Sequence, residues 1–389
     1  MTGGEHSSSA LSLYIHIPWC VRKCPYCDFN SHAAREPIPE AAYVAALLGD
    51  LDRELTGLTQ WPPPLVSLFI GGGTPSLFSG DAIARLLAGI GQRLPLDPTT
   101  EITLEANPGT ADAANFTAYR AAGVNRLSLG VQSLSADRLR DLGRIHGPDE
   151  ARHAFRLARQ AGFDNINLDL MYGLPHQGLP QAREDLTQAL ALAPEHLSYY
   201  QLTLEPNTPF HATPPPLPDD DLGADMQLQG LELLSASGFA QYEVSAHAQS
   251  GRQCRHNLHY WTFGDYLGIG AGAHGKRRDP ATGCTWRQAK PRQPAAYLQA
   301  LGSPDPVGSR WMLQDEDLVL EFAMNALRLT AGFDRRRFTQ STGLDLDRLA
   351  TPLTSAVEAG LLAIRGDWVR PTERGRWFLN DLLGHFMPD

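Results

Sequence analysis

The stretch YIHIPWCVRKCPYCDFNSH, residues 14–32, contains three of the five cysteines of the chain, Cys20, Cys24 and Cys27. It overlaps the β-rich run LSLYIHI, residues 11–17, so the cysteines follow directly on a predicted strand. Prolines on both sides of Cys20 and Cys24 keep this segment out of a helix, because proline has no amide hydrogen. The spacing C-x3-C-x2-C therefore predicts an open loop that brings three thiols together.

Thiolate sulfur is a ligand for zinc, copper and iron–sulfur clusters. A tetrahedral zinc ion needs a fourth ligand, which His16 or His32 could supply. Structural zinc sites usually combine two C-x2-C elements, however, and the chain has no second pair. An iron–sulfur cubane held by three thiolates instead leaves one iron open to a small molecule. The position of the loop at a strand end favours the cluster, with zinc as the alternative.

Length and composition indicate a folded protein of two or three domains. The chain has 389 residues, of which 42% are hydrophobic, and a formal net charge of −10. We expect a cytoplasmic location, because no apolar run reaches the ~18 residues of a membrane span and residues 1–10 lack the features of a signal peptide. Residues 1–10 are predicted to be disordered. The negative charge argues against general nucleic-acid binding.

Short β-rich runs alternate with amphipathic helical segments from Leu11 to about residue 275. The six predicted strands are residues 11–17, 65–70, 101–106, 126–133, 166–173 and 196–205. Repeated βα units require a parallel sheet, and either a doubly wound sheet or a full or partial barrel satisfies the pattern. Polar or glycine residues follow nearly every strand, and in a barrel those strand ends converge on one mouth. This feature favours the barrel.

The remaining chain has a different rhythm. The proline-dense segment 206–220 is predicted to lack regular helix, a helix is expected over 222–237, residues 254–261 are turn-rich and residues 303–309 form a linker. Residues 310–389 predict helices at 315–329, 334–341 and 345–359, then two short strands and a terminal helix. This order is typical of a winged-helix-like module. DNA binding is one interpretation, but the segment has 10 arginines and 12 acidic residues, which favours a structural lid or docking domain.

Polar residues at the predicted barrel mouth are candidates for binding a small molecule. The run GGGT, residues 71–74, offers bare backbone to which a zwitterionic amino acid group could bind, although a tight βα turn explains the glycines equally well. Glu105, Gln132 and Asp169 end three further strands, where each could hydrogen-bond a ribose hydroxyl or an ammonium group. A helix cap or strand-end hydrogen bond is the alternative for each of them.

The cysteine spacing with Tyr26 before Cys27 resembles that of the radical S-adenosylmethionine superfamily. The resemblance implies that Cys20, Cys24 and Cys27 ligate a [4Fe-4S] cluster. It also implies that the amino and carboxylate groups of S-adenosylmethionine chelate the fourth iron, and that reduction yields a 5′-deoxyadenosyl radical. The ligand missing from the chain would then be the cosubstrate.

Motifs over residues 11–385 resemble one branch of this superfamily, the oxygen-independent coproporphyrinogen III oxidase group and the related HemW heme chaperones. They include YIHIPWC, GGGTPS, LEANP, LGRIHG, NLDLMYGLP and GIGAGAH, in the family's order. The resemblance implies a partial (β/α)6 TIM-like barrel, an α/β fold, with a small, mainly helical C-terminal domain. It implies that Tyr14, Gly72 and Glu105 contact the cluster-bound S-adenosylmethionine. It further implies contacts to a second S-adenosylmethionine by Tyr26, Gly73, Thr74, Gln132, Arg144 and Asp169.

Three features are more typical of the chaperones than of the oxidases. Phe29 occupies the place of the oxidase's fourth cysteine, and only 13 residues precede Tyr14, whereas the oxidase has a long N-terminal extension. The segment CRHNLHYW, residues 254–261, contains the pattern H-N-x-x-Y-W, which we associate with the chaperones. Phe29 makes coproporphyrinogen III dehydrogenase activity doubtful.

Residues 254–261 are also the candidate heme-binding segment. Heme iron binds imidazole, thiolate or phenolate, and the macrocycle packs against apolar and aromatic side chains. His256 is the first candidate ligand and Tyr260 the second, with a buried polar turn as the alternative. Cys254 could also ligate heme, although a lone cysteine is more often a small buried side chain. The basic loop around Cys284 could meet heme propionates or simply be solvated.

We therefore expect a heme chaperone that binds heme and a [4Fe-4S] cluster with S-adenosylmethionine and passes heme to acceptor proteins of membrane respiratory complexes. The alternative is an oxygen-independent coproporphyrinogen III oxidase. The expected domains are the barrel at 11–300 and the C-terminal domain at 310–389, and a homodimer is a further expectation.

Overall fold

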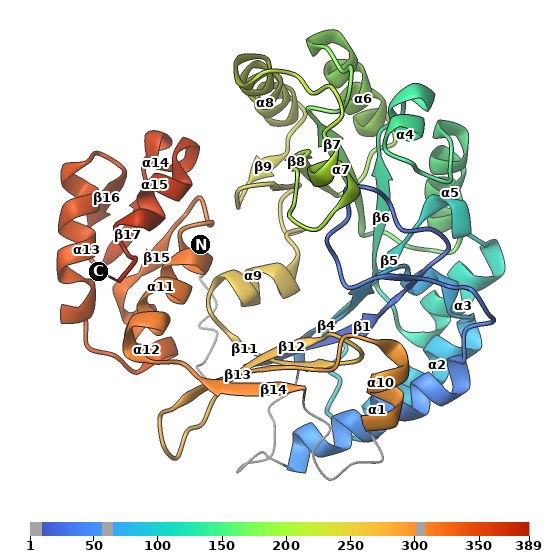
Figure 1. Ribbon diagram of the computed structural model, residues 1–389, viewed down its shortest axis with the longest axis horizontal. Coiled ribbons are helices and arrows are strands. Elements are labelled where there is room, and N and C mark those ends of the chain that lie inside the picture. Colours follow the sequence, from blue (N-terminus) through green and yellow to red (C-terminus); the bar gives the residue numbers. More distant parts are fainter. Residues whose placement is uncertain (1–9, 57–64, 301–307, 389) are drawn as a thin grey trace.

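The computed structural model describes residues 10–56, 65–300 and 308–388. Its main sheet has the strand order β14-β13-β12-β11-β1-β4-β5-β6-β7-β8-β10-β9 (Figure 1). Six central strands run parallel to one another. They are β1 (Leu11–Ile17), β4 (Leu65–Gly72), β5 (Glu101–Ala106), β6 (Arg126–Gln132), β7 (Ile166–Tyr172) and β8 (His196–Gln201). The six parallel strands and their helices form an open sheet that does not close on itself. The predicted partial (β/α)6 barrel is therefore confirmed.

Helices follow the parallel strands and cover the outer face of the sheet (Figure 1). They are α1 (Glu40–Thr56), α2 (Gly80–Gly91), α3 (Ala113–Ala122), α4 (Ala136–Asp141), α5 (Pro148–Gln160) and α6 (Leu179–Ala191). Side-chain caps mark where some of them begin: Ser79 accepts a hydrogen bond from the amide of Ala82, and Asp112 accepts one from Asn115. Gly123, with φ of 110°, ends α3 in the left-handed conformation.

Alternation along the strands separates an apolar outer face from a polar inner face. In β1, Leu11, Leu13, Ile15 and Ile17 belong to the hydrophobic core, while Ser12, Tyr14 and His16 occupy the alternate positions. Successive side chains of a strand point to opposite faces of the sheet. The same alternation continues in β5 to β8, whose inner positions are Glu101, Thr103, Glu105, Arg126, Ser128, Asn167, Asp169, His196 and Ser198. The interior of the barrel is therefore lined with polar groups.

The chain after β8 extends the sheet at both of its edges and adds further helices. It forms α7 (Pro209–Ala212), α8 (Asp220–Ala236), β9 (Ala240–Gln241), β10 (Ala246–Ala248), α9 (Arg255–Trp261), β11 (Asp265–Ile269), β12 (His274–Arg278), β13 (Thr285–Ala289), α10 (Pro294–Ala300) and β14 (Ser309–Met312). Helix α9 lies on the side of the sheet opposite the outer helices (Figure 1).

Two predictions for this part of the chain were wrong. The segment 206–220 contains the one-turn helix α7, because Thr208 caps it and Pro209 occupies its first turn, where a missing amide hydrogen costs nothing. The segment 254–261 is helical rather than turn-rich, since α9 packs on β4 and β11. The predicted disordered segment 1–10, apart from Ala10, and most of the predicted linker 303–309 lie outside the described residues.

The C-terminal residues supply most of a second hydrophobic core, which includes Phe322, Phe338 and Val369, and Phe263 from the barrel part of the chain joins it. The elements are α11 (Asp315–Ala326), β15 (Phe333–Asp334), α12 (Arg335–Thr342), α13 (Asp347–Glu358), β16 (Leu362–Arg365), β17 (Trp368–Pro371), α14 (Glu373–Trp377) and α15 (Leu379–Gly384). Their order is the one predicted for a winged-helix-like module. No helix among the described residues is long and apolar enough to cross a membrane.

Candidate functional site

The three clustered cysteines lie around one cavity of about 700 Å³ at the carboxyl ends of the strands. Cys20 ends the short strand β2 (Trp19–Cys20), which pairs with β3 (His32–Ala33) and so closes the base of the loop. The amide of Cys27 donates to the carbonyl of Cys24 at 3.2 Å, which turns the chain between them. Within the described part of the chain, no three His, Cys, Asp or Glu side chains are grouped as a site for a single metal ion.

Each thiol has a polar neighbour. Thr74 Oγ1 donates to Cys20 Sγ at 3.5 Å, Arg144 Nη1 donates to Cys24 Sγ at 3.7 Å, and Cys27 Sγ lies 3.8 Å from Ser31 Oγ. Burial raises the pKa of Cys20 and of Cys27, which disfavours free thiolates. Hydrogen-bond donors and a guanidinium stabilise thiolates that ligate a positive centre. This donor set fits an iron–sulfur cluster.

The glycine turn after β4 is shaped chiefly by its own neighbours. The amide of Gly72 donates to Glu105 Oε2 at 3.1 Å, and the amides of Gly73 and Thr74 donate to the carbonyls of Ile17 and Trp19, each at 2.7 Å. A Cβ on Gly73 would lie 2.5 Å from the carbonyl oxygen of Trp19. These amides extend the pairing of the barrel with the cysteine loop, as in a tight βα turn, and the binding of an amino acid group by this run stays a prediction.

Two half-buried carboxyl groups, those of Glu105 and Asp169, line the thiol cavity. Burial, reinforced by the negative charge of Asp169, raises the pKa of Glu105 to about 8. Burial also raises the pKa of Asp169, which accepts hydrogen bonds from Asn167 Nδ2 at 2.8 Å and from Ser128 Oγ at 3.5 Å. A cationic ligand would favour the ionised form of both groups.

Other predicted residues surround the same cavity. Gln132, at a bulge in β6 and with φ of 69°, accepts a hydrogen bond from the hydroxyl of Tyr200 at 2.9 Å. Arg144 Nη2 donates to the carbonyl of Gly130 at 2.6 Å, whereas its buried Nε has no partner among the described residues. Tyr26 lines the cavity as well. The orphaned Nε provides a donor that a bound acceptor would satisfy.

A second cavity, of about 1050 Å³, occupies the inner side of the barrel. Its wall includes Tyr14, Phe69, His256, Tyr260 and Trp261. The residues that line both cavities are Phe29, Gly72, Glu105, Ser128, Asp169 and Ser198. The thiol cavity and the inner cavity therefore adjoin along the inner faces of β4 to β8.

His256 reaches the inner cavity from α9 and is held in one orientation. Its Nδ1 lies 2.9 Å from Ser67 Oγ, its amide donates to Glu101 Oε1 at 3.2 Å, and its ring centre lies 5.0 Å from that of Phe69. Burial lowers the pKa of His256 to about 3, so the imidazole is neutral. With Nδ1 turned to Ser67, Nε2 is the nitrogen that can ligate a metal.

The other candidates of this segment are distributed differently. Tyr260 lines the inner cavity, and its hydroxyl lies 3.5 Å from that of Tyr266. His259 instead turns to the carbonyl oxygen of Asp265, 2.7 Å from its Nε2, and is absent from the wall of the inner cavity. Cys254 is buried against Glu101, and burial raises its pKa to about 12, in keeping with a small buried side chain. Cys284 lies outside both cavities, between β12 and β13.

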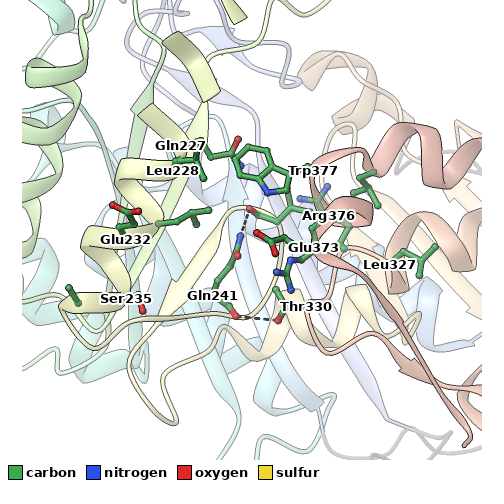
Figure 2. A pocket seen from close by; sticks show the side chains of 15 residues that line it. Gln227, Leu228, Glu232, Ser235, Gln241, Leu327, Thr330, Glu373, Arg376 and Trp377 are labelled. Atoms are coloured by element: carbon green, nitrogen blue, oxygen red, sulfur yellow. Dashed lines mark hydrogen bonds between the residues drawn. The ribbon is translucent and has the colours of Figure 1, made fainter. Parts of the chain in front are cut away.

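Sequence reasoning missed Arg126, Ser67 and Glu101, which all belong to the inner face. Their alternation with the apolar residues of β4, β5 and β6 was the available signal. It also missed a cavity of about 590 Å³ between the barrel and the C-terminal residues, where side chains of α8 lie opposite those of α14 (Figure 2). None of the predicted site residues lines that cavity.

Comparison with known proteins agrees with this arrangement. The Radical SAM superfamily matches residues 14–189, and the HemN C-terminal domain matches residues 313–378. The heme chaperone HemW of Escherichia coli (strain K12) is 50% identical over 379 residues, covering 97% of this chain and 98% of that protein. This chain belongs to the HemW family. HemW of Bacillus subtilis (strain 168) is 35% identical over 384 residues, covering 97% of this chain and 99% of its own length.

The fold of this HemW family member is that of a solved relative. The coproporphyrinogen III oxidase HemN of Escherichia coli, a radical SAM enzyme, matches with a TM-score of 0.81 at 22% identity, covering 97% of this chain and 90% of its own. The predicted family is thus confirmed. Membership of the radical SAM superfamily brings with it a [4Fe-4S] cluster and S-adenosylmethionine as cofactors.

Proposed function

We propose that this chain is a heme chaperone, which binds heme in the inner cavity and passes it to acceptor proteins. Heme chaperone is the name given to relatives that match it over nearly its whole length. The observation that supports the proposal most directly is the contact between the two cavities, one lined by three thiols and the other by His256 and aromatic side chains. Heme and the iron–sulfur cofactor would then occupy adjoining sites.

In this proposal, Cys20, Cys24 and Cys27 ligate the [4Fe-4S] cluster. When bound, the cluster and S-adenosylmethionine together supply an electron and a source of an adenosyl radical. The residues proposed to contact the cluster-bound S-adenosylmethionine are Tyr14, Gly72 and Glu105. Those proposed for a second S-adenosylmethionine are Tyr26, Gly73, Thr74, Gln132, Arg144 and Asp169. The side chain of Gly73 is absent and its amide is occupied, so any contact from this residue comes from other backbone atoms.

His256 is the proposed iron ligand, with Tyr260 as the second candidate. A neutral imidazole whose Nδ1 is hydrogen-bonded is oriented to offer Nε2 to iron. Tyr260, Trp261 and Phe69 supply the aromatic wall that a macrocycle requires. Residues 254–261 would then form the heme-binding segment of a barrel domain at 11–300.

The acceptors are proposed to be proteins of membrane respiratory complexes. The C-terminal domain, residues 310–389, is proposed as the docking surface because its described residues include these exposed large apolar side chains: Trp311, Met312, Met324, Leu346, Val357, Trp368, Phe378 and Met387. A second copy of the chain could use the same surface, and light scattering of the purified protein will distinguish a homodimer from a monomer. We propose a cytoplasmic location because thiols remain reduced there.

Heme titration of the anaerobically reconstituted protein, with and without S-adenosylmethionine, tests the proposal. We expect saturable uptake of heme without any change in the porphyrin. The competing function is oxidative decarboxylation of coproporphyrinogen III, and Phe29 in place of the oxidase's fourth cysteine argues against it. Formation of protoporphyrinogen together with 5′-deoxyadenosine would contradict the chaperone proposal.

A further inference from the structure

Arg126, the first residue of β6, lines the inner cavity, and the negative charges of Glu101 and Asp169 act on it without forming an ion pair. Its exposed fraction is 2%, and no carboxylate oxygen of the described residues lies within 4.0 Å of its guanidinium nitrogens. Its buried Nε has no hydrogen-bond partner among these residues either. An arginine keeps its positive charge at every physiological pH. Such a buried charge calls for an anion.

The carboxylates nearest in the fold are occupied by other donors. Glu101 Oε1 accepts from the thiol of Cys254 and the amide of His256, at 3.6 and 3.2 Å. Asp169 accepts from Asn167 and Ser128, as described above. The carboxylate oxygens of Glu101 and Asp169 therefore accept hydrogen bonds from neutral donors, and the guanidinium of Arg126 faces the cavity.

Lys290, the other buried cation on the wall of this cavity, is arranged differently. Its Nζ lies 2.6 Å from Asp50 Oδ1 and also pairs with Glu54, so its charge is compensated within the protein. The contrast shows that the fold can supply carboxylates to a buried cation. At Arg126, Glu101 and Asp169 act on the charge only from beyond ion-pair distance, and no carboxylate of the described residues pairs with it directly.

The surroundings of Arg126 indicate which anion fits. Arg126 shares the cavity with His256, and its charge contributes, after burial and His259, to the lowered pKa of that imidazole. Aromatic side chains line the same space. A planar ligand whose iron binds His256 would share this cavity with Arg126, so that its acid groups could reach the guanidinium. The planar guanidinium pairs well with a carboxylate, through two parallel hydrogen bonds.

We propose that Arg126 binds a carboxylate of the tetrapyrrole, one of the two propionates, inside the inner cavity. This inference rests on the proposed heme-binding function and deepens it. The carboxylate of a methionine group offers the same chemistry, so the experiment separates these two sources.

Absorbance titrations with heme and with heme dimethyl ester test the inference. Both ligands present the same iron to His256, and only heme has free carboxylates. The wild-type protein is expected to bind heme about tenfold more tightly than the diester, the size expected for a charge-assisted hydrogen bond. Arg126→Gln is expected to bind both ligands with the affinity that the wild type has for the diester. An unchanged preference for heme in folded Arg126→Gln overturns the inference.

Arg292→Gln is the matched control, because Arg292 lines the same cavity but is exposed. It is expected to retain most of the preference for heme, and loss of the preference in this variant alone overturns the assignment. Iron content and S-adenosylmethionine affinity are expected to be unchanged in Arg126→Gln. If that variant loses S-adenosylmethionine binding and keeps the preference for heme, the carboxylate belongs to methionine and the inference fails.

Arg126→Lys keeps the inference testable if Arg126→Gln does not fold. Lysine retains the charge and loses the paired donors, so its preference for heme is expected to be weaker than that of the wild type. An undiminished preference contradicts the inference. Failure of the proposed function has a different signature, since the wild type would then bind neither ligand. Equal binding of both ligands by the wild type overturns only the role of Arg126.

Discussion

Ser67 Oγ lies 2.9 Å from Nδ1 of His256 and joins the inner face of β4 to helix α9. Ser67 in turn lies 2.8 Å from Ser12 Oγ on β1, so the imidazole is positioned by a chain of hydroxyl groups from two strands. In the tautomer of His256 that has its hydrogen on Nδ1, the imidazole donates to Ser67 Oγ. Nε2 then has its lone pair available to iron.

Replacing His256 by alanine is expected to weaken heme binding at least tenfold, because the variant removes the proposed iron ligand. The Soret band of the bound heme will shift, and the iron–sulfur content will remain at the wild-type level. Ser67→Ala is the graded variant: it keeps the imidazole and removes the group that orients it, so a smaller loss is expected. Unchanged heme affinity in His256→Ala would rule this residue out as the ligand.

Replacing any one of Cys20, Cys24 and Cys27 by serine is expected to abolish the cluster, since each would provide one of only three protein ligands. Iron and sulfide analysis and the visible absorbance after anaerobic reconstitution measure the loss. Cys254→Ser and Cys284→Ser are the controls, and both should retain the cluster. If a control variant lost the cluster and the variants of Cys20, Cys24 and Cys27 kept it, the assignment of the cluster ligands would be wrong.

The affinity for S-adenosylmethionine is expected to rise as the pH increases from 7 to 9. The pKa of Glu105 is raised to about 8, so the group gains its negative charge across this range, and the cationic ligand prefers the ionised carboxylate. The affinity is expected to rise by about tenfold at most, because the ionised fraction of Glu105 increases by about that factor between pH 7 and 9. The Glu105→Gln variant has no group that ionises at this position. Its pH profile therefore reports the titration of S-adenosylmethionine itself. Identical pH profiles for the two proteins would contradict the role of Glu105.

Acid is expected to destabilise the protein partly through His146. Its Nε2 lies 3.1 Å from the carbonyl oxygen of Val131, and burial, reinforced by the charge of Arg144, lowers its pKa to about 4. The unfolded chain binds a proton near pH 6.5 and the folded chain does not, so stability falls as the pH drops from about 6.5 toward 4. The contribution between pH 7 and 5 is about 2 kcal/mol.

Urea unfolding of the protein without added ligands, at pH 7 and at pH 5, measures this effect. His146→Gln can keep a donor to Val131 but cannot titrate, and it should lose less free energy of unfolding over this interval than the wild type. An equal loss in both proteins would assign the acid sensitivity to other groups.

The barrel strands could be predicted because each alternates apolar and polar residues over six to eight positions and ends at a turn or loop. The same alternation indicates which residues lie on the inner face, including Arg126. The contacts of these residues could not be predicted, because they depend on which strands are neighbours. Helix α9 was not predicted, since seven residues are too few for a helical period to stand out. Its helical form comes from packing on β4, which lies far away in the sequence, and on β11, which follows it directly.

The site was predictable to the extent that its residues are close together in the chain. Cys20, Cys24 and Cys27 are within one loop, so their spacing was informative by itself. Ser67 and His256 are 189 residues apart, and Glu101 and Cys254 are 153 apart, so no local pattern connects them. The use of the Gly73 and Thr74 amides by the carbonyls of Ile17 and Trp19 likewise depends on a pairing that only the folded sheet creates.

The division of each strand into an apolar and a polar face has an evolutionary consequence. Leucine and isoleucine on the outer face carry the hydrophobic stabilisation, whereas the inner residues contact one another and the cavities. Substitutions on the inner face can therefore alter what the barrel accepts while the outer packing persists. A slip of one residue in any strand would exchange the faces and lose both properties together. Substitutions on the inner face can thus change which ligand the barrel binds, whereas the register in which its strands pair has to be kept.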